Sequence, residues 1–180
     1  MAELETVKTT REVKAIAVPF GNEILLPADT EVIILQALGG TYTVIAGGQT
    51  LRIAEVDADA LGKTKPIQES IIDNPNLSLE DKVWAQLKTC YDPEIPVDIV
   101  DLGLIYGITV ETLAQDVHKV IIKMTLTAPG CGMGPIIAAE AKQKVLMIPK
   151  VKEVEIEMVF DPPWDRSRLS ETAKLVLGLL

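Results

Sequence analysis

Residues 117–160 read VHKVIIKMTLTAPGCGMGPIIAAEAKQKVLMIPKVKEVEIEMVF, a pattern that predicts strand, glycine-rich loop, helix and strand in that order. The first strand has one apolar face, formed by the alternating residues Val120, Ile122, Met124 and Leu126. Pro135 suits the first turn of a helix, whose buried stripe is predicted to be Ile137, Ala141 and Val145. From about Val154 to Phe160 the alternation returns, so we expect a parallel pair of strands joined by a right-handed crossover.

Further elements flank this unit on both sides. Ser78 and Asp81 form a predicted capping box before a helix that ends near Cys90. Residues 104–110 and 117–126 are predicted to pair as antiparallel strands, and a last short helix covers about 170–177. The resulting order is helix, strand, strand, helix, strand, helix, which predicts a two-layer α/β domain over residues 78–180.

The N-terminal part has a different texture. Between about residues 12 and 56, short apolar runs alternate with turn signals such as Gly39-Gly40 and Gly47-Gly48, which predict five strands in a small sheet or a partly closed barrel. Residues 66–77 are rich in helix- and strand-breaking residues and are predicted to be a linker. We therefore expect an α+β protein with a small all-β domain at 1–65, a linker at 66–77 and the α/β domain at 78–180.

Composition excludes several classes of function. Hydrophobic residues make up 48% of the 180 residues, enough for a packed core, and the net charge of −9 argues against nucleic acid or an anionic membrane as a partner. Two cysteines are too few for a secreted disulfide framework. With no signal-peptide pattern and no membrane-length apolar run, we expect a cytoplasmic protein.

Cys131 is the first candidate for chemistry. It lies among Gly130, Gly132 and Gly134, between a strand pattern and a helix pattern. Glycines allow close approach of a ligand, and the positive end of the following helix favours a thiolate over a thiol. The loop therefore suits metal ligation, sulfur chemistry or redox attack, while a buried apolar role at a tight turn is the alternative.

A second group of candidates lies between Cys90 and Asp101. Cys90 is expected at a helix end, where a packing role and a ligand role both stay open. The stiff segment that follows carries four carboxylates, which could bind a metal through oxygen. Asp98 and Asp101 are better explained as turn caps, whereas turn chemistry does not explain Glu94.

Two other residues are weaker candidates. Trp164 after Pro162-Pro163 either roofs a site or packs in the core. His118 is the single histidine of the chain and is expected at the opposite end of its strand from the cysteine loop, because the eight residue steps from His118 to Leu126 span about 26 Å at ~3.3 Å each. Cys131 therefore lacks a catalytic base, and no zinc-type spacing is present.

Four ordered motifs carry a resemblance to a known family. They are TCYDPEIPV at 89–97, VDLGLIY at 100–106, MTLTAPGCGMG at 124–134 and DPPW at 161–164. Together they resemble the SufT family of iron–sulfur assembly factors. Residues 79–180 resemble the wider group with PaaD-like proteins and the cytosolic iron–sulfur targeting subunits, and the N-terminal half resembles the extra domain of SufT-type proteins.

This resemblance implies a non-enzymatic role in the maturation of iron–sulfur proteins. It implies that Cys131 is the functional thiol and matches Cys90 and Glu94 to motif positions, so Cys131, Cys90 and Glu94 are the predicted metal-site residues, with both cysteines contacting a transient iron–sulfur cluster. The implied partners are the assembly machinery and client apoproteins. The alternatives are a metal-free adaptor that docks clients and a thiol-redox enzyme, which the lack of a nearby resolving cysteine disfavours.

The number of thiols constrains how a cluster could be held. A cubane cluster usually takes four thiolate ligands, and one chain offers two. The simplest hypothesis is a cluster bridging a homodimer through Cys131 of each chain, completed by Cys90 or by external thiols. A cluster held in this way would be labile and therefore transferable.

Overall fold

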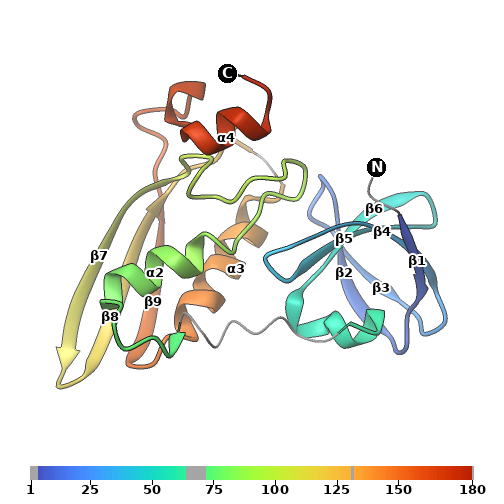
Figure 1. Ribbon diagram of the computed structural model, residues 1–180, viewed down its shortest axis with the longest axis horizontal. Coiled ribbons are helices and arrows are strands. Elements are labelled where there is room, and N and C mark those ends of the chain that lie inside the picture. The colour runs from blue at the N-terminus through green and yellow to red at the C-terminus, as the bar shows by residue number, and fades with distance from the viewer. Residues whose placement is uncertain (1–3, 64–71, 131, 180) are drawn as a thin grey trace. The chain divides into compact units, whose positions relative to one another are not determined.

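The computed structural model describes residues 4–63, 72–130 and 132–179. By its internal contacts the chain divides into two compact units, Met1–Ile67 with Pro93–Ile95, and Gln68–Asp92 with Pro96–Leu180. They are called the N-terminal unit and the C-terminal unit below (Figure 1). The protein is of the α+β class, with a β-rich N-terminal unit and a C-terminal unit of helices on a three-stranded sheet.

The N-terminal unit is a six-stranded antiparallel sheet in the order β1-β4-β5-β6-β2-β3. Its strands are β1 (Glu5–Lys8), β2 (Val13–Ala17), β3 (Glu23–Leu26), β4 (Glu31–Leu38), β5 (Thr41–Ala46) and β6 (Gln49–Ile53). A 3₁₀ helix, η1 (Glu55–Leu61), follows β6. The five strands predicted between about residues 12 and 56 are β2 to β6. β1 lies before that range and was not predicted, because it lacks an apolar face and forms by pairing with the distant β4.

Polar contacts connect the start of this unit to its end. The Arg11 guanidinium binds the carboxylates of Asp57 and Asp59 at 2.9 and 2.8 Å. The hydrogen bonds that Arg11 donates to these two carboxylates raise the pKa of Arg11 above its usual range. Arg11 therefore stays charged, and it ties the loop before β2 to η1.

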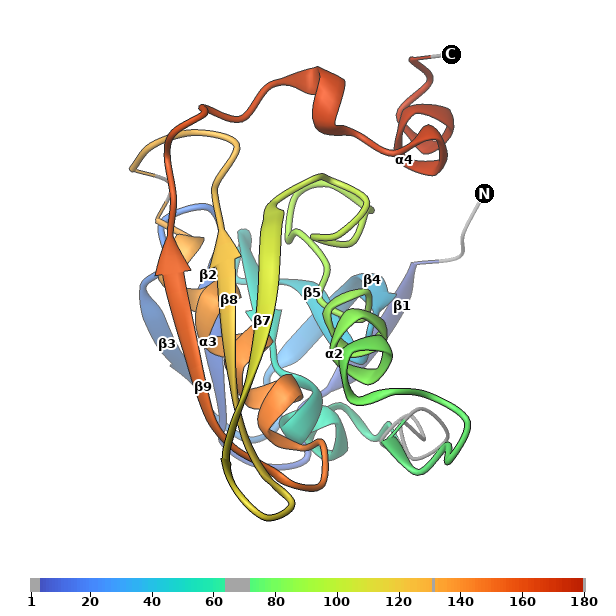
Figure 2. The same cartoon turned by 90° about the vertical axis from the view of Figure 1, so that its left-hand side faces the viewer.

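The C-terminal unit has the predicted order of elements. These are α2 (Leu79–Leu87), β7 (Ile105–Ala114), β8 (Val117–Met124), α3 (Gly134–Leu146), β9 (Val151–Met158), the 3₁₀ turn η2 (Arg166–Arg168) and α4 (Glu171–Val176). β7 and β8 pair antiparallel, while β8 and β9 pair parallel across the α3 crossover, as expected. Figure 2 shows this sheet with α3 behind it.

The core of the C-terminal unit lies between this sheet and the helices. The predicted apolar stripes of β8 and α3 are buried, with Val120, Ile122, Ile137, Ala141 and Val145 all at most 2% exposed. The capping box of α2 is also confirmed, because the Asp81 amide donates to Ser78 Oγ at 3.1 Å and the Ser78 amide donates to Asp81 Oδ2 at 3.3 Å.

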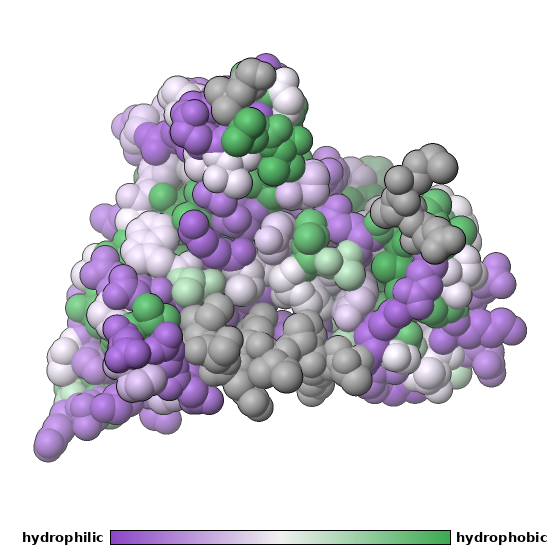
Figure 3. Space-filling model, viewed as in Figure 1, coloured by the Kyte–Doolittle hydropathy of each residue, from purple (hydrophilic) through white to green (hydrophobic). Residues whose placement is uncertain are grey.

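Two features of the surface complete the description. α4 and the residues after it expose apolar side chains: Leu175 and Val176 of the helix and Leu179 beyond it are each 48–66% exposed, and Figure 3 shows the green patch over α4. Within the described ranges, no helix is long and apolar enough to cross a membrane.

Candidate functional site

The loop that carries Cys131 joins β8 to α3. Cys131 itself lies outside the described residues, so its thiol stays a prediction. Gly130 before it has φ +82°, a conformation that glycine adopts without strain. A Cβ at Gly134 would press on the Leu126 side chain, so a glycine lets the start of α3 lie directly against the residues after β8.

The first turn of α3 carries a positive partial charge that nothing described offsets. Met133 is the N-cap residue, and its side chain makes no capping hydrogen bond. There is also no acidic residue in the first turn of α3. Free N–H groups and the helix dipole at this end of a helix stabilise an anion bound nearby.

Cys90 lies in the interior of the C-terminal unit. Its side chain is fully buried (0% exposed), and Sγ lies 3.8 Å from the Gln86 carbonyl oxygen. The adjacent Thr89 accepts two hydrogen bonds from Lys144 Nζ, at 2.7 Å to its carbonyl oxygen and 3.0 Å to Oγ1. Lys144 belongs to α3, so the Cys90 turn is fixed to the helix that follows the Cys131 loop.

Glu94 lies in a loop whose two ends are tied together by main-chain bonds. The Asp92 amide donates to the Val97 carbonyl at 3.2 Å, and the Ile99 amide donates to the Cys90 carbonyl at 2.9 Å. Glu94 is exposed and falls among the residues grouped with the N-terminal unit, whereas Cys90 falls in the C-terminal unit.

Asp98 caps the turn that follows, as the sequence predicted. Its Oδ1 accepts hydrogen bonds from the amides of Val100 at 3.0 Å and Asp101 at 2.9 Å. Burial, with the nearby Asp101 carboxylate, raises the pKa of Asp98. Burial and the negative charges of Asp98 and Asp101 likewise raise the pKa of Tyr91, so a proton is retained more readily in this cluster than in water.

The chain that follows β9, called the C-terminal segment below, is bound to the turn that Asp98 caps. This contact was not predicted from the sequence. Trp164 Nε1 donates to the Leu102 carbonyl at 2.8 Å, and the Ser170 amide donates to the Asp101 carbonyl at 2.9 Å. The only trace of this in the sequence is a glycine at position 103. The structure gives the reason for that glycine, because it has φ +72° and a Cβ there would overlap the Arg168 carbonyl oxygen.

Tyr106 at the start of β7 adds two contacts to that segment. Its hydroxyl donates to the Pro162 carbonyl at 2.7 Å, and the Arg168 guanidinium lies 4.0 Å from its ring centroid. These contacts join the start of β7 to the same segment that carries Trp164.

His118 lies at the start of β8, at the opposite end of the strand from the Cys131 loop, as expected. Its Nδ1 lies 3.4 Å from Thr112 Oγ1. Within residues 4–63, 72–130 and 132–179 there is no group of three or more His, Cys, Asp or Glu side chains arranged to hold a metal ion.

Comparison with known proteins adds the family. Residues 80–158 match the family model described as iron-sulfur cluster assembly protein. A protein of Porphyromonas gingivalis named Fe-S protein maturation auxiliary factor is 40% identical over 109 residues, which are 61% of this chain and 100% of that relative. This chain belongs to the iron–sulfur cluster assembly protein family. The resemblance to SufT-type proteins is thereby confirmed.

Other members of the iron–sulfur cluster assembly protein family agree with this. The Fe-S protein maturation auxiliary factor SufT of Staphylococcus aureus is 40% identical over 88 residues, which cover 49% of this chain and 96% of SufT. The crystal structure of a domain of unknown function from Bacillus anthracis is 38% identical, with a TM-score of 0.52, over 57% of this chain and 93% of that one. The family model does not extend to residues 1–79, so the resemblance seen there stays a prediction.

Proposed function

We propose that this protein is an auxiliary factor in the maturation of iron–sulfur proteins, and that it carries or hands over a labile cluster, or iron, through Cys131. The names of the relatives in Porphyromonas gingivalis and Staphylococcus aureus support the role. The observation that carries the chemistry is the uncapped first turn of α3, which begins three residues after Cys131 and favours an anionic ligand.

The cluster is cargo in this proposal, and the protein is a carrier and not a catalyst. Because Cys90 is fully buried, burial supports a packing role for it, and the remaining thiols come from a second copy or from a partner. Glu94 is exposed and is kept as a candidate oxygen ligand. The partners are the assembly machinery and client apoproteins, in the cytoplasm.

The test is anaerobic reconstitution of the purified full chain with iron and sulfide. Visible absorption and iron counting are compared for the wild type, Cys131→Ser and Cys90→Ala. We expect a chromophore in the wild type that Cys131→Ser lacks and that Cys90→Ala retains, and we expect the loaded protein to pass its cluster to an apoprotein.

Other outcomes separate the alternatives. If neither the wild type nor Cys131→Ser takes up a cluster, while client apoproteins still bind to this protein without iron, the protein is an adaptor. A monomer that holds a full complement of iron and sulfide would contradict the bridged cluster. Catalytic thiol turnover that requires Cys131 would indicate a redox enzyme.

A further inference from the structure

We propose that the free edge of β9, together with the groove between β9 and α3, binds an extended segment of a partner protein whose outward side chains are basic. This docking surface consists of the β9 edge, the groove residues of α3, and Glu153, Glu155 and Glu157. It lies within the C-terminal unit and goes beyond the proposed function, because it does not depend on Cys131 or on a cluster.

The outer edge of β9 has main-chain groups available for pairing. The sheet order is β7-β8-β9, so within the described chain β9 pairs with β8 alone. Just past the end of β9, the Val159 amide donates to the Met124 carbonyl at 2.8 Å, so Val159 directs its main chain toward β8. The N–H and C=O groups of successive residues in a strand point alternately to its two sides. Val154 and Ile156 are an odd number of positions from Val159, so their N–H and C=O groups point to the free edge.

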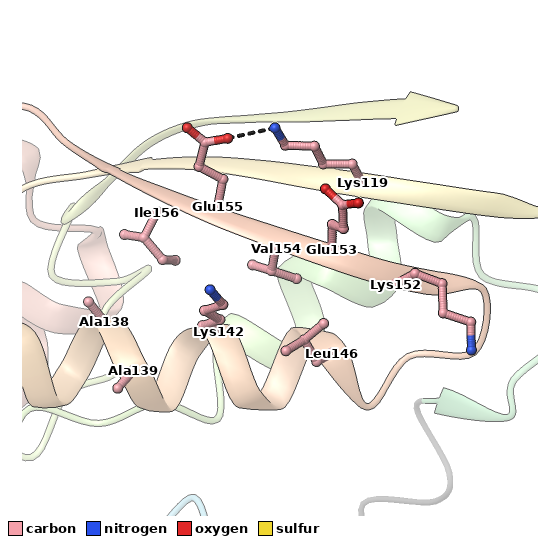
Figure 4. A pocket seen from close by; sticks show the side chains of 10 residues that line it. All are labelled: Lys119, Ala138, Ala139, Lys142, Leu146, Lys152, Glu153, Val154, Glu155 and Ile156. Carbon is pink, nitrogen blue, oxygen red and sulfur yellow. Dashed lines mark ion pairs between the residues drawn. The ribbon is translucent and has the colours of Figure 1, made fainter. Parts of the chain in front are cut away.

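A groove runs beside this edge, where small residues on α3 leave room. Its volume is about 620 Å³, and its apolar lining consists of Ala138, Ala139 and Leu146 of α3 with Val154 and Ile156 of β9. Lys119, Lys142 and Lys152 also line it, so the side chains that a partner places over the groove itself are expected to be apolar and not basic. Figure 4 shows Val154 and Ile156 pointing toward α3, while Glu153 and Glu155 project from the opposite face of the strand. A strand added here would place alternate side chains over the groove and the others beside the glutamates.

The charges on the face of β9 that is turned away from α3 determine which outward side chains of the partner fit. Glu153, Glu155 and Glu157 lie on one face of β9. On the β8 side, Lys119 Nζ binds Glu155 at 2.6 Å and Lys123 Nζ lies 3.9 Å from Glu157, while no ion pair in the described ranges involves Glu153. Opposite charges facing each other across strands are stabilising, so lysine or arginine at alternate positions matches this face.

The same charges argue against a second copy of β9 as the occupant. Antiparallel self-pairing centred on Glu155 would place Glu155 against its own copy and Glu153 against Glu157 of that copy. Like charges directly opposite each other destabilise a strand pair. A basic extended segment of a different protein therefore fits this edge better than a homodimer does.

The test uses the full chain and a fluorescein-labelled octapeptide of alternating lysine and valine. We expect saturable binding by fluorescence anisotropy, with slower amide hydrogen exchange in residues 151–158, and no binding of a glutamate–valine peptide. Glu153→Lys should weaken binding about five- to tenfold, because one attractive cross-strand pair becomes repulsive. Ala139→Phe, which fills the groove from an exposed helix position, should weaken binding as well.

Glu12→Lys is the matched control, since it makes the same change of charge at an exposed residue of the N-terminal unit. It should leave the affinity within about twofold. Equal loss in Glu153→Lys and Glu12→Lys would overturn the proposal in favour of unspecific attraction to a chain of charge −9. Exchange protection outside residues 151–158, no binding at all, or a dimer formed through β9 in sedimentation would also overturn it.

Discussion

At the scale of single residues, Cys90 is described directly, whereas for Cys131 the structure describes only the residues on either side. Cys90 is buried beside the end of α2, and a thiol in such surroundings behaves as a small apolar group. Cys131 follows the φ +82° glycine at position 130 and precedes an uncapped helix end, where a thiolate is stabilised. We therefore propose different roles for the two cysteines, packing for Cys90 and ligation for Cys131.

Cys90→Ala should lower the free energy of unfolding by about 1–2 kcal/mol, because it leaves a small cavity in a packed interior. Urea denaturation of the apoprotein measures this. The iron content per folded chain after reconstitution should not change. Loss of iron at unchanged stability would show instead that Cys90 is a ligand.

Asp98→Asn should change how stability depends on pH. Burial raises the pKa of Asp98 above the ordinary value of 3.8, so the folded chain keeps a proton that the unfolded chain has already lost. The stability contributed by Asp98 is therefore complete below that ordinary value and is lost as the pH rises through the folded pKa. Asparagine keeps an oxygen that can accept from the amides of Val100 and Asp101. The stability of the wild type relative to Asp98→Asn should therefore fall as the pH rises from the ordinary value through the folded pKa.

Asp165→Asn is the control, and its effect on stability should have the opposite dependence on pH. Hydrogen bonds from Ser167 lower the pKa of Asp165, so its contribution is present above the ordinary value and is lost as the pH falls. Urea denaturation of both variants across the acid range should show differences of opposite sign. The same sign for both would contradict the assignment of Asp98.

At the scale of elements, the turn at 98–104 is held by the chain that follows β9. Asp101 and Leu102 accept hydrogen bonds from Ser170 and Trp164 through their carbonyl oxygens, and Gly103 lies against Arg168. These contacts fix the turn between the Cys90 segment and β7. The C-terminal segment is thus part of the support for the candidate site.

Gly103→Ala tests this contact. The residue has φ +72° and no space for a Cβ beside the Arg168 carbonyl, so we expect a loss of about 2–4 kcal/mol of unfolding free energy. Gly178→Ala is the matched control, because Gly178 has φ +67° with open space around it and should lose about 1 kcal/mol. If urea denaturation gave the same loss of unfolding free energy for both variants, backbone strain alone would account for the effect at Gly103, without the contact with Arg168.

The elements found from sequence are those with a strong local pattern. Alternation along β8 and helical spacing in α3 are local properties, and the Ser78–Asp81 box marks the start of α2 within four residues. β1 was missed because its stability comes from pairing with β4, and the Trp164 bond spans 62 positions to Leu102. The site was predicted from motifs, but the C-terminal segment that supports its turn depends on long-range contacts that no local pattern contains.

At the scale of the whole molecule, the two units differ in how they relate to known proteins. The family model covers residues 80–158, and the Porphyromonas gingivalis relative is matched over its entire length by 109 residues of this chain. A chain as short as that relative must bury its own core. The core of the C-terminal unit here, built from α2, α3 and the β7-β8-β9 sheet, is formed by residues that follow position 72.

We therefore expect residues 72–180, expressed alone, to fold cooperatively and to load as much iron and sulfide per chain as the full protein. Circular dichroism and urea denaturation test folding, and iron counting after anaerobic reconstitution tests loading. Gly103→Ala made in this fragment should lose the same free energy as in the full chain, because its contact with Arg168 lies inside the C-terminal unit. An unfolded fragment would show that the N-terminal sheet is needed for folding. A folded fragment that cannot load would assign the N-terminal unit a direct part in cluster handling.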